Sequence, residues 1–274
     1  MKTLEFIGDY IYNNDMLTPV KSVQSIDVKD SPVYEIIKII SGVPLFYESH
    51  LKRLHKSLEL VNLKADITKE TLLYKVKELC KANNIYFGNI ELVIYRDKNN
   101  TISHLGFIKH SYPEPMSYIE GVSVGVISAE RDMPNAKIKN TETRQKANTF
   151  LSNNNFYEVL LVDKNNKITE GSRSNFFYIK GDIVYTAPES VVLSGITRKY
   201  IIEILKKIGV QLIEKMLFID DVKSIDAALL CGTSPGILPI KNINNYNLNV
   251  ENNILRRLIL EFNSYVKEYI IEIQ

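Results

Sequence analysis

A carboxylate and an amide, Glu170 and Asn175, stand just before a run of aromatic residues in EGSRSNFFY, residues 170–178. The residues before and after it are typical of two strands joined by a turn. Strands favour apolar and β-branched residues, so Glu170 and Asn175 need a reason for their position. Either they satisfy the hydrogen bonds of a turn, or they belong to a site in which a carboxylate holds a proton on a neighbouring group.

A second candidate lies in LSGITRKYI, residues 193–201. The small residues Ser194 and Gly195 open a helix, and Thr197 falls in its first turn. The N–H groups of a helix N-terminus lack internal partners and carry a partial positive charge, a geometry that binds phosphate. An ordinary capped helix gives the same pattern, so this segment alone does not establish a phosphate site.

The elements that position these residues follow from periodicity. Residues 33–46 read as two strands around Ser41-Gly42, and residues 89–96 and 102–108 read as a second strand pair. Apolar residues at helical spacing predict helices over residues 47–62 and 68–83. The first part of the chain is therefore predicted to be α+β.

Residues 110–121 contain two prolines and no clear period, so residues 114–121 are the candidate linker. We expect an N-terminal domain over residues 1–113 and a C-terminal domain over residues 122–274. The C-terminal part should contain strands at 122–128, 156–163, 167–179, 182–186, 210–217 and 225–232, with helices near 196–208 and 249–270.

Composition places the chain among globular proteins. Its 274 residues are 45% hydrophobic and 24% charged, with a net charge of +2, so neither disorder nor nucleic-acid binding is expected. Cys80 and Cys231 lie in apolar surroundings without metal-ligand spacing, which predicts buried free thiols and a cytoplasmic protein. We expect no metal site, no signal peptide and no membrane span.

Joined together, the two candidate segments form a longer pattern, E-x-S-x-x-N-F-F, I-x-x-T and L-x-G-I-x-R, separated by five and six residues. This resembles the signature of the class IV, or fold type IV, pyridoxal-phosphate enzymes, which include branched-chain and D-amino-acid aminotransferases and aminodeoxychorismate lyases. The resemblance covers residues 33–239. It implies a smaller N-terminal α+β domain, a larger C-terminal barrel-like β domain with flanking helices, and pyridoxal 5'-phosphate as cofactor.

By this resemblance, Glu170 holds the proton of the cofactor's pyridine nitrogen, which lets the ring accept electrons. Asn175 is expected to support the local backbone. The phosphate is expected on the N–H groups of Ile196 and Thr197, and on Arg53, because HLKRL resembles the family's H-x-x-R-L segment. His50 in the same segment is expected to pack within its helix.

The family also requires a lysine that forms a Schiff base with the cofactor. The segment PNAKIKNTETRQK offers Lys137, Lys139 and Lys146. Lys137 and Asn140 have the family's K-x-x-N spacing, which favours Lys137. Lys139 has the same side-chain parity on an extended strand, so periodicity does not exclude it. We expect the chosen lysine to have a lowered pKa and to move the proton at the substrate Cα.

The remaining site residues also come from the resemblance. GTSPGILPI resembles a family loop that binds phosphate and substrate carboxylate, which assigns Thr233 to the cofactor and Ser234 to the substrate. Arg96 matches a position near the substrate carboxylate, although a charge at a strand end fits equally well. Tyr34 fits the end of a pocket pattern that Lys29, Asp30 and Pro32 otherwise interrupt.

Three functions fit these residues. The first is an aminotransferase that moves an amino group between an amino acid, branched-chain-like or D-configured, and a 2-oxo acid. The second is a lyase of the aminodeoxychorismate type, which needs no amino acceptor. The third is a homologue that binds the cofactor without aminotransferase turnover. The resemblance also implies a homodimer whose partners are small molecules, with no nucleic acid and no membrane.

Overall fold

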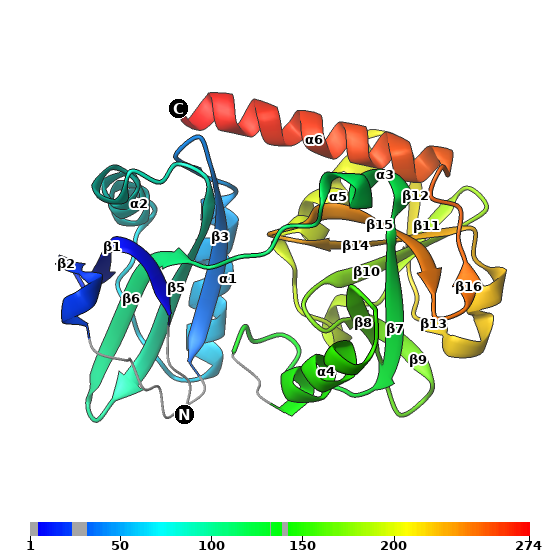
Figure 1. Cartoon of the computed structure of the whole chain (residues 1–274), viewed down its shortest axis with the longest axis horizontal. Coiled ribbons are helices and arrows are strands. Elements are labelled where there is room, and N and C mark those ends of the chain that lie inside the picture. The colour runs from blue at the N-terminus through cyan, green and yellow to red at the C-terminus, as the bar shows by residue number, and fades with distance from the viewer. Residues whose placement is uncertain (1–4, 24–31, 132, 139–141) are drawn as a thin grey trace. The chain divides into compact units, whose positions relative to one another are not determined.

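The computed structural model describes residues 5–23, 32–131, 133–138 and 142–274. The chain divides into two compact units, each with its own sheet (Figure 1). Unit 1 comprises Met1–Ser111, Ala136–Lys139 and Val266–Gln274, and unit 2 comprises Tyr112–Asn135 and Asn140–Tyr265. Both returning segments of unit 1 lie within the region that the sequence assigns to the C-terminal domain. The domain boundaries at 113 and 122 stay a prediction, which limited proteolysis would test.

Unit 1 is a six-stranded antiparallel sheet in the order β2-β1-β6-β5-β3-β4, with two helices. Its strands are β1 (Phe6–Asn13), β2 (Met16–Pro19), β3 (Val33–Ile40), β4 (Val43–Pro44), β5 (Gly88–Asp97) and β6 (Asn100–Ile108). The helices are α1 (Tyr47–Leu60) and α2 (Lys69–Asn83), with a short 3₁₀ turn, η1 (Val20–Ser22).

The core of unit 1 lies where the helices cover one face of the sheet. Residues of β3 alternate between buried and half-buried, as expected for a strand with one face against helices. Apolar residues about one turn apart fill the other side of this core: Leu51, Leu54 and Leu58 of α1, and Leu72, Val76 and Leu79 of α2. Thr68 caps α2 by accepting the N–H of Thr71 at 3.2 Å. The predicted hairpin, both helices and the second strand pair are confirmed.

Unit 2 is built on a ten-stranded mixed sheet in the order β12-β11-β10-β14-β15-β7-β8-β9-β13, with β16 paired to β15. The strands are β7 (Val122–Ser128), β8 (Glu158–Val162), β9 (Lys167–Gly171), β10 (Asn175–Lys180), β11 (Ile183–Thr186), β12 (Gln211–Glu214), β13 (Leu217–Phe218), β14 (Ala227–Gly232), β15 (Gly236–Ile243) and β16 (Tyr246–Asn247). The helices are α3 (Pro115–Glu120), α4 (Glu142–Asn153), α5 (Ile196–Lys207) and the part of α6 (Asn253–Ile273) before Val266, with 3₁₀ turns η2 (Glu189–Val191) and η3 (Ile219–Ser224).

Six helices and strands differ from the sequence expectation. Strands β1, β2, β15 and β16 and helix α4 were not predicted, and helix α3 forms inside the segment expected to be a linker. The burial of β1 does not alternate, and Ala147 is the one buried residue of α4, so neither element carries a clear apolar period. Both cysteines are buried and free, as predicted. No helix in the described part of the chain is long and apolar enough to span a membrane.

Candidate active site

Glu170 lies in β9 and is 2% exposed, so it is a buried strand residue and not a solvated turn residue. Its Oε2 accepts hydrogen bonds from Asn175 Nδ2 at 3.1 Å and from the backbone N–H of Leu193 at 3.3 Å. Its Oε1 lies 2.7 Å from Arg131 Nε, an ion pair that lacks the alignment of a hydrogen bond. Asn175 also donates to the carbonyl of Leu193 at 2.9 Å, so it supports the carboxylate and the backbone together.

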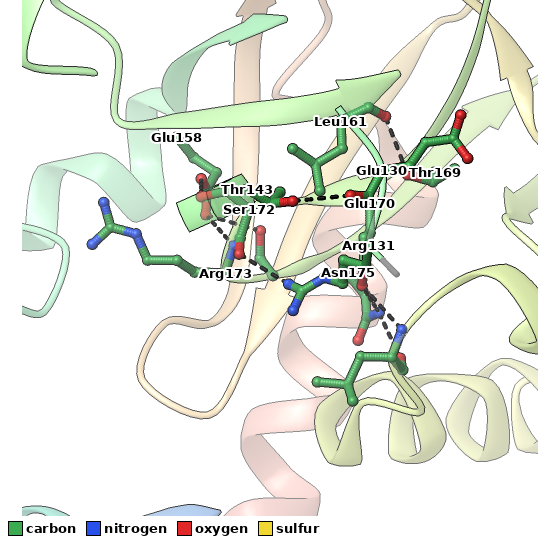
Figure 2. Close-up of polar contacts among 12 residues, drawn as sticks. Glu130, Arg131, Thr143, Glu158, Leu161, Thr169, Glu170, Ser172, Arg173 and Asn175 are labelled. Carbon is green, nitrogen blue, oxygen red and sulfur yellow. Dashed lines mark hydrogen bonds and ion pairs between the residues drawn. The ribbon is translucent and has the colours of Figure 1, made fainter. Parts of the chain in front are cut away.

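Figure 2 shows that the loop between β9 and β10 is held from both sides. Ser172 Oγ donates to the buried carboxylate of Glu158 at 2.7 Å, and the N–H of Arg173 reaches the same carboxylate at 3.2 Å. The carbonyl of Ser172 accepts a hydrogen bond from Arg131 Nη2 at 2.9 Å. Arg131 and Glu158 were not identified from the sequence, where neither carries a motif signal. Together they fix the loop that carries Glu170 and Asn175.

Helix α5 begins beside this carboxylate. Its N-cap is Gly195, which has no side chain to satisfy the N–H groups of the first turn, and Ile196 and Thr197 are both buried. Glycine is required at residue 195 for a steric reason, because a Cβ there would overlap Asn175 Oδ1. The N-terminus of α5, which lacks a side-chain cap and carries a partial positive charge, therefore lies next to Asn175, the residue that donates to Glu170.

Thr233 and Ser234 lie in the tight loop that joins β14 to β15, and β15 begins at Gly236, which adopts a φ of +67°. The register of β10 on β14 pairs Asn175 with Cys231. The loop with Thr233 thus follows the last residue of β14, beside the first residues of β10. Unit 2 therefore brings the loop after Glu170 and the loop with Thr233 to the same ends of these two neighbouring strands.

Arg53 lies on α1 in unit 1 and is buried against Glu35 of β3. Its Nε and Nη2 donate to Glu35 Oε1 and Oε2 at 2.7 and 2.6 Å, and His50 Nδ1 lies 2.7 Å from Oε2. Burial alone would raise the pKa of Glu35, but Arg53 and His50 lower it to about 2, so the carboxylate stays charged. Burial lowers the pKa of His50. His50 is buried on α1, and its ring contacts Glu35 of β3.

Lys137 lies in a short segment that runs beside the first residues of β3, where Ile138 forms an isolated bridge with Val33. Its Nζ stands over the ring of Tyr34, 4.7 Å from the ring centroid. Its carbonyl accepts the N–H of Tyr34 at 3.1 Å, and its N–H donates to Ser57 Oγ of α1 at 3.2 Å. Unit 1 therefore brings together Lys137 and Tyr34. Lys139, Asn140 and Thr141, like Lys29 and Asp30, lie outside the described residues.

Arg96 lies at the exposed end of β5 and donates to the carbonyl of Asn62 at 2.7 Å. Its assignment to the substrate stays a prediction. His104 of β6 was not identified from the sequence. It is buried, its Nε2 lies 3.1 Å from the hydroxyl of Tyr95, and burial lowers its pKa to about 4, so it is neutral at physiological pH.

Comparison with known proteins gives the family. The model of the family Amino-transferase class IV matches residues 32–243, more than three quarters of the chain. The chain belongs to the class IV aminotransferase family. This membership confirms the prediction made from the E-x-S-x-x-N-F-F pattern and makes the protein an enzyme of the aminotransferase class, whose substrates are amino acids and 2-oxo acids. The family as a whole depends on pyridoxal phosphate.

Individual relatives of this class IV aminotransferase carry different activities. A D-alanine aminotransferase of Listeria innocua is 27% identical over 250 residues, which cover 84% of this chain and 86% of that protein. An aminodeoxychorismate lyase of Bacillus subtilis is 24% identical over 231 residues, 78% of each chain. A branched-chain aminotransferase from the archaeon Thermoproteus uzoniensis, solved with norvaline, superposes with a TM-score of 0.84 at 22% identity, covering 94% of this chain and 95% of that one. This likeness confirms the predicted fold class.

Proposed function

We propose that this class IV aminotransferase binds pyridoxal 5'-phosphate and moves an amino group between an amino acid and a 2-oxo acid. The observation that carries the proposal is Glu170, a buried carboxylate held in place by Asn175, Leu193 and Arg131. A carboxylate fixed in one place favours a positive charge beside it, and the protonated pyridine nitrogen of the cofactor is a group that fits.

The chemistry of the available groups fits the cofactor. Pyridoxal phosphate presents an aldehyde, a phosphate and a basic ring nitrogen, and the chain offers an amine, phosphate donors and a carboxylate. We assign the aldehyde to Lys137 and the ring nitrogen to Glu170. The phosphate is assigned to a set of cationic and neutral donors: Arg53, Ile196, Thr197 and Thr233. The uncapped start of α5 supports the part of Ile196 and Thr197.

When bound, pyridoxal phosphate supplies an electron-accepting ring; the remaining steps are carried out by the protein. Once the substrate amine has replaced it at the aldehyde, the Lys137 amine would move the proton of the substrate Cα to the former aldehyde carbon, and would move it back during the reverse half-reaction. A carboxylate at Glu170 stabilises the positive charge of the ring nitrogen through both steps. Ser234, Arg96 and Tyr34 are assigned to the substrate, with Tyr34 supported by its contact with Lys137.

The test is a visible absorption spectrum of the purified protein with pyridoxal phosphate, titrated with L- and D-amino acids. The proposal predicts the absorption band of lysine-bound cofactor and its loss when a suitable amino acid is added, with release of the matching 2-oxo acid. Adding a 2-oxo acid should restore the band. A protein that forms no such band contradicts both the cofactor assignment and the role of Lys137.

Aminodeoxychorismate-type lyase activity is the second candidate, favoured by the similarity to the Bacillus subtilis enzyme of that name. The same spectrum distinguishes the two, because a lyase forms the lysine-bound band but no amino acid converts the cofactor to its amine form. The substrate of the transaminase is proposed to be a D-amino acid or a branched-chain-like amino acid. The titration compares D-alanine, L-leucine and L-valine directly.

We also propose a cytoplasmic homodimer. The two buried free thiols support a reducing compartment, where cysteines stay unpaired. Light scattering coupled to size-exclusion chromatography tests the assembly. A mass of one 31.4 kDa chain across the micromolar range would contradict the dimer.

A further inference from the structure

One face of helix α1 carries three buried polar side chains. His50, Arg53 and Ser57 follow one another at intervals of three and four residues, which places them in a row on the same face. All three are at least nine-tenths buried. Polar groups are buried at a cost unless they find partners, so this row needs an account beyond helix packing.

Glu35 is the partner of two members of the row. It is 1% exposed and stands on the face of β3 that otherwise packs apolar residues, Val33 and Ile37, against α1. Both of its oxygens accept from Arg53, and Oε2 is also within hydrogen-bond distance of His50. Ser57, one turn further on, accepts the N–H of Lys137. The row therefore joins Glu35 to the segment that carries the proposed catalytic lysine.

The way Glu35 holds Arg53 restricts the guanidinium to one orientation. The side-on pair engages Nε–H and one N–H of Nη2, two of the five N–H groups that arginine carries. A planar group held by two parallel hydrogen bonds cannot rotate about its own axis, and its other N–H groups face away from the carboxylate. Glu35 itself cannot bind an anion, because two negative charges repel.

We propose that Glu35 is a positioning residue for phosphate binding, which orients the Arg53 guanidinium toward the phosphate group of the cofactor. This inference rests on the proposed function, in which Arg53 binds that phosphate. His50 completes the arrangement by sharing Glu35 Oε2, which keeps the carboxylate from turning away from Arg53. Glu35 acts through Arg53 and touches neither cofactor nor substrate.

The experiment compares two ligands that differ only in the phosphate group, pyridoxal phosphate and pyridoxal. Equilibrium dialysis gives the dissociation constant of each for the full-length wild type and for Glu35→Gln, Arg53→Ala and Glu91→Gln. Glu91 is a buried carboxylate on the neighbouring strand, in register with Ile36 rather than Glu35, and serves as the matched control. Circular dichroism confirms that each variant is folded.

We expect the wild type to bind pyridoxal phosphate more tightly than pyridoxal. Glu35→Gln should lower the affinity for pyridoxal phosphate about tenfold or more, the effect of losing one well-oriented charged hydrogen bond, and leave pyridoxal within about twofold. Arg53→Ala should reduce the preference for the phosphate further, and Glu91→Gln should not change it. A merely structural role of Glu35 would weaken both ligands equally, and that outcome overturns the proposal.

Two further outcomes are decisive. Glu35→Asp keeps the charge and shortens the side chain by one methylene, so it tests the orientation even if Glu35→Gln does not fold. It should give a phosphate preference between those of the wild type and Arg53→Ala, and an unchanged preference overturns the inference. A wild type that does not discriminate between the two ligands refutes the proposed function instead, because no phosphate site would then exist.

Discussion

Replacing Gly195 with alanine is predicted to destabilise the protein by displacing Asn175. The φ of Gly195 is −64°, which alanine adopts without strain, so the backbone gives no reason for glycine. The steric reason is that the new Cβ would overlap Asn175 Oδ1 and lie 3.0 Å from Asn175 Cγ. The Asn175 amide must then leave its position between Glu170 and the carbonyl of Leu193.

The cost follows from the two hydrogen bonds that Asn175 loses. The bond to the charged Glu170 contributes roughly 1.5–3 kcal/mol and the bond to the Leu193 carbonyl roughly 0.5–1.5 kcal/mol, about 3 kcal/mol in all. Asn175→Ala removes the same bonds and should cost about the same amount. In the double variant the alanine at residue 195 has room, so its total cost should also stay at about 3 kcal/mol instead of doubling.

Urea unfolding of the wild type, both single variants and the double variant measures this cycle. Gly232→Ala is the control, since a Cβ there meets nothing closer than 3.6 Å, and it should be neutral or slightly stabilising. A coupling energy of about 3 kcal/mol between residues 175 and 195 is expected. Additive costs would refute the reasoning, because they would mean that Asn175 does not occupy the space that Gly195 leaves.

Three further predictions follow from the site. Glu35 has a pKa of about 2 in the folded protein against 4.5 when unfolded. Its contribution to the free energy of unfolding, on the order of 3 kcal/mol, is therefore complete above pH 4.5 and is lost as the pH falls towards 2. The free energies of unfolding of the wild type and Glu35→Gln, plotted against pH, should converge over that range, and curves that stay parallel would contradict the ion pair with Arg53. Glu170→Gln should lower kcat of the amino-group transfer by roughly 100-fold or more at saturating cofactor, and a variant with normal kcat would show that no ring charge is stabilised there. Thr197→Val should weaken cofactor binding about fivefold in the same dialysis assay. Thr186→Val is the control, because it removes a buried hydroxyl that donates a hydrogen bond to the carbonyl of Phe176; it should lower stability and leave cofactor binding unchanged.

Local pattern was sufficient for the elements that bury a regular apolar face. The leucines of α1 and α2 repeat at helical spacing and the residues of β3 alternate, so these elements could be predicted from sequence. Helix α4 could not, because it buries only Ala147, and a helix without an apolar stripe has no periodic signal. Glu170 was identified because its motif spans consecutive strands and the start of α5.

The partners of these residues needed the structure. Arg53 pairs with Glu35 across 18 residues, and Glu35 sits among apolar residues of a strand where the sequence gives no sign of a partner. Arg131 reaches Glu170 from a loop with no regular pattern. Ion pairs of this kind depend on how strands and helices pack, which periodicity does not specify. Periodicity also does not choose Lys137 over Lys139, since an extended strand directs both to the same side.

Reduction of the cofactor-loaded protein with borohydride, followed by peptide mapping, tests the central claim most directly. Borohydride fixes the cofactor permanently to whichever lysine holds it, and mass spectrometry then identifies that residue. The account predicts a single phosphopyridoxyl group on Lys137, which amino acid added before the reduction should prevent. Label on Lys139 would contradict the assignment of the lysine, and the absence of any label would contradict pyridoxal-phosphate catalysis by this protein.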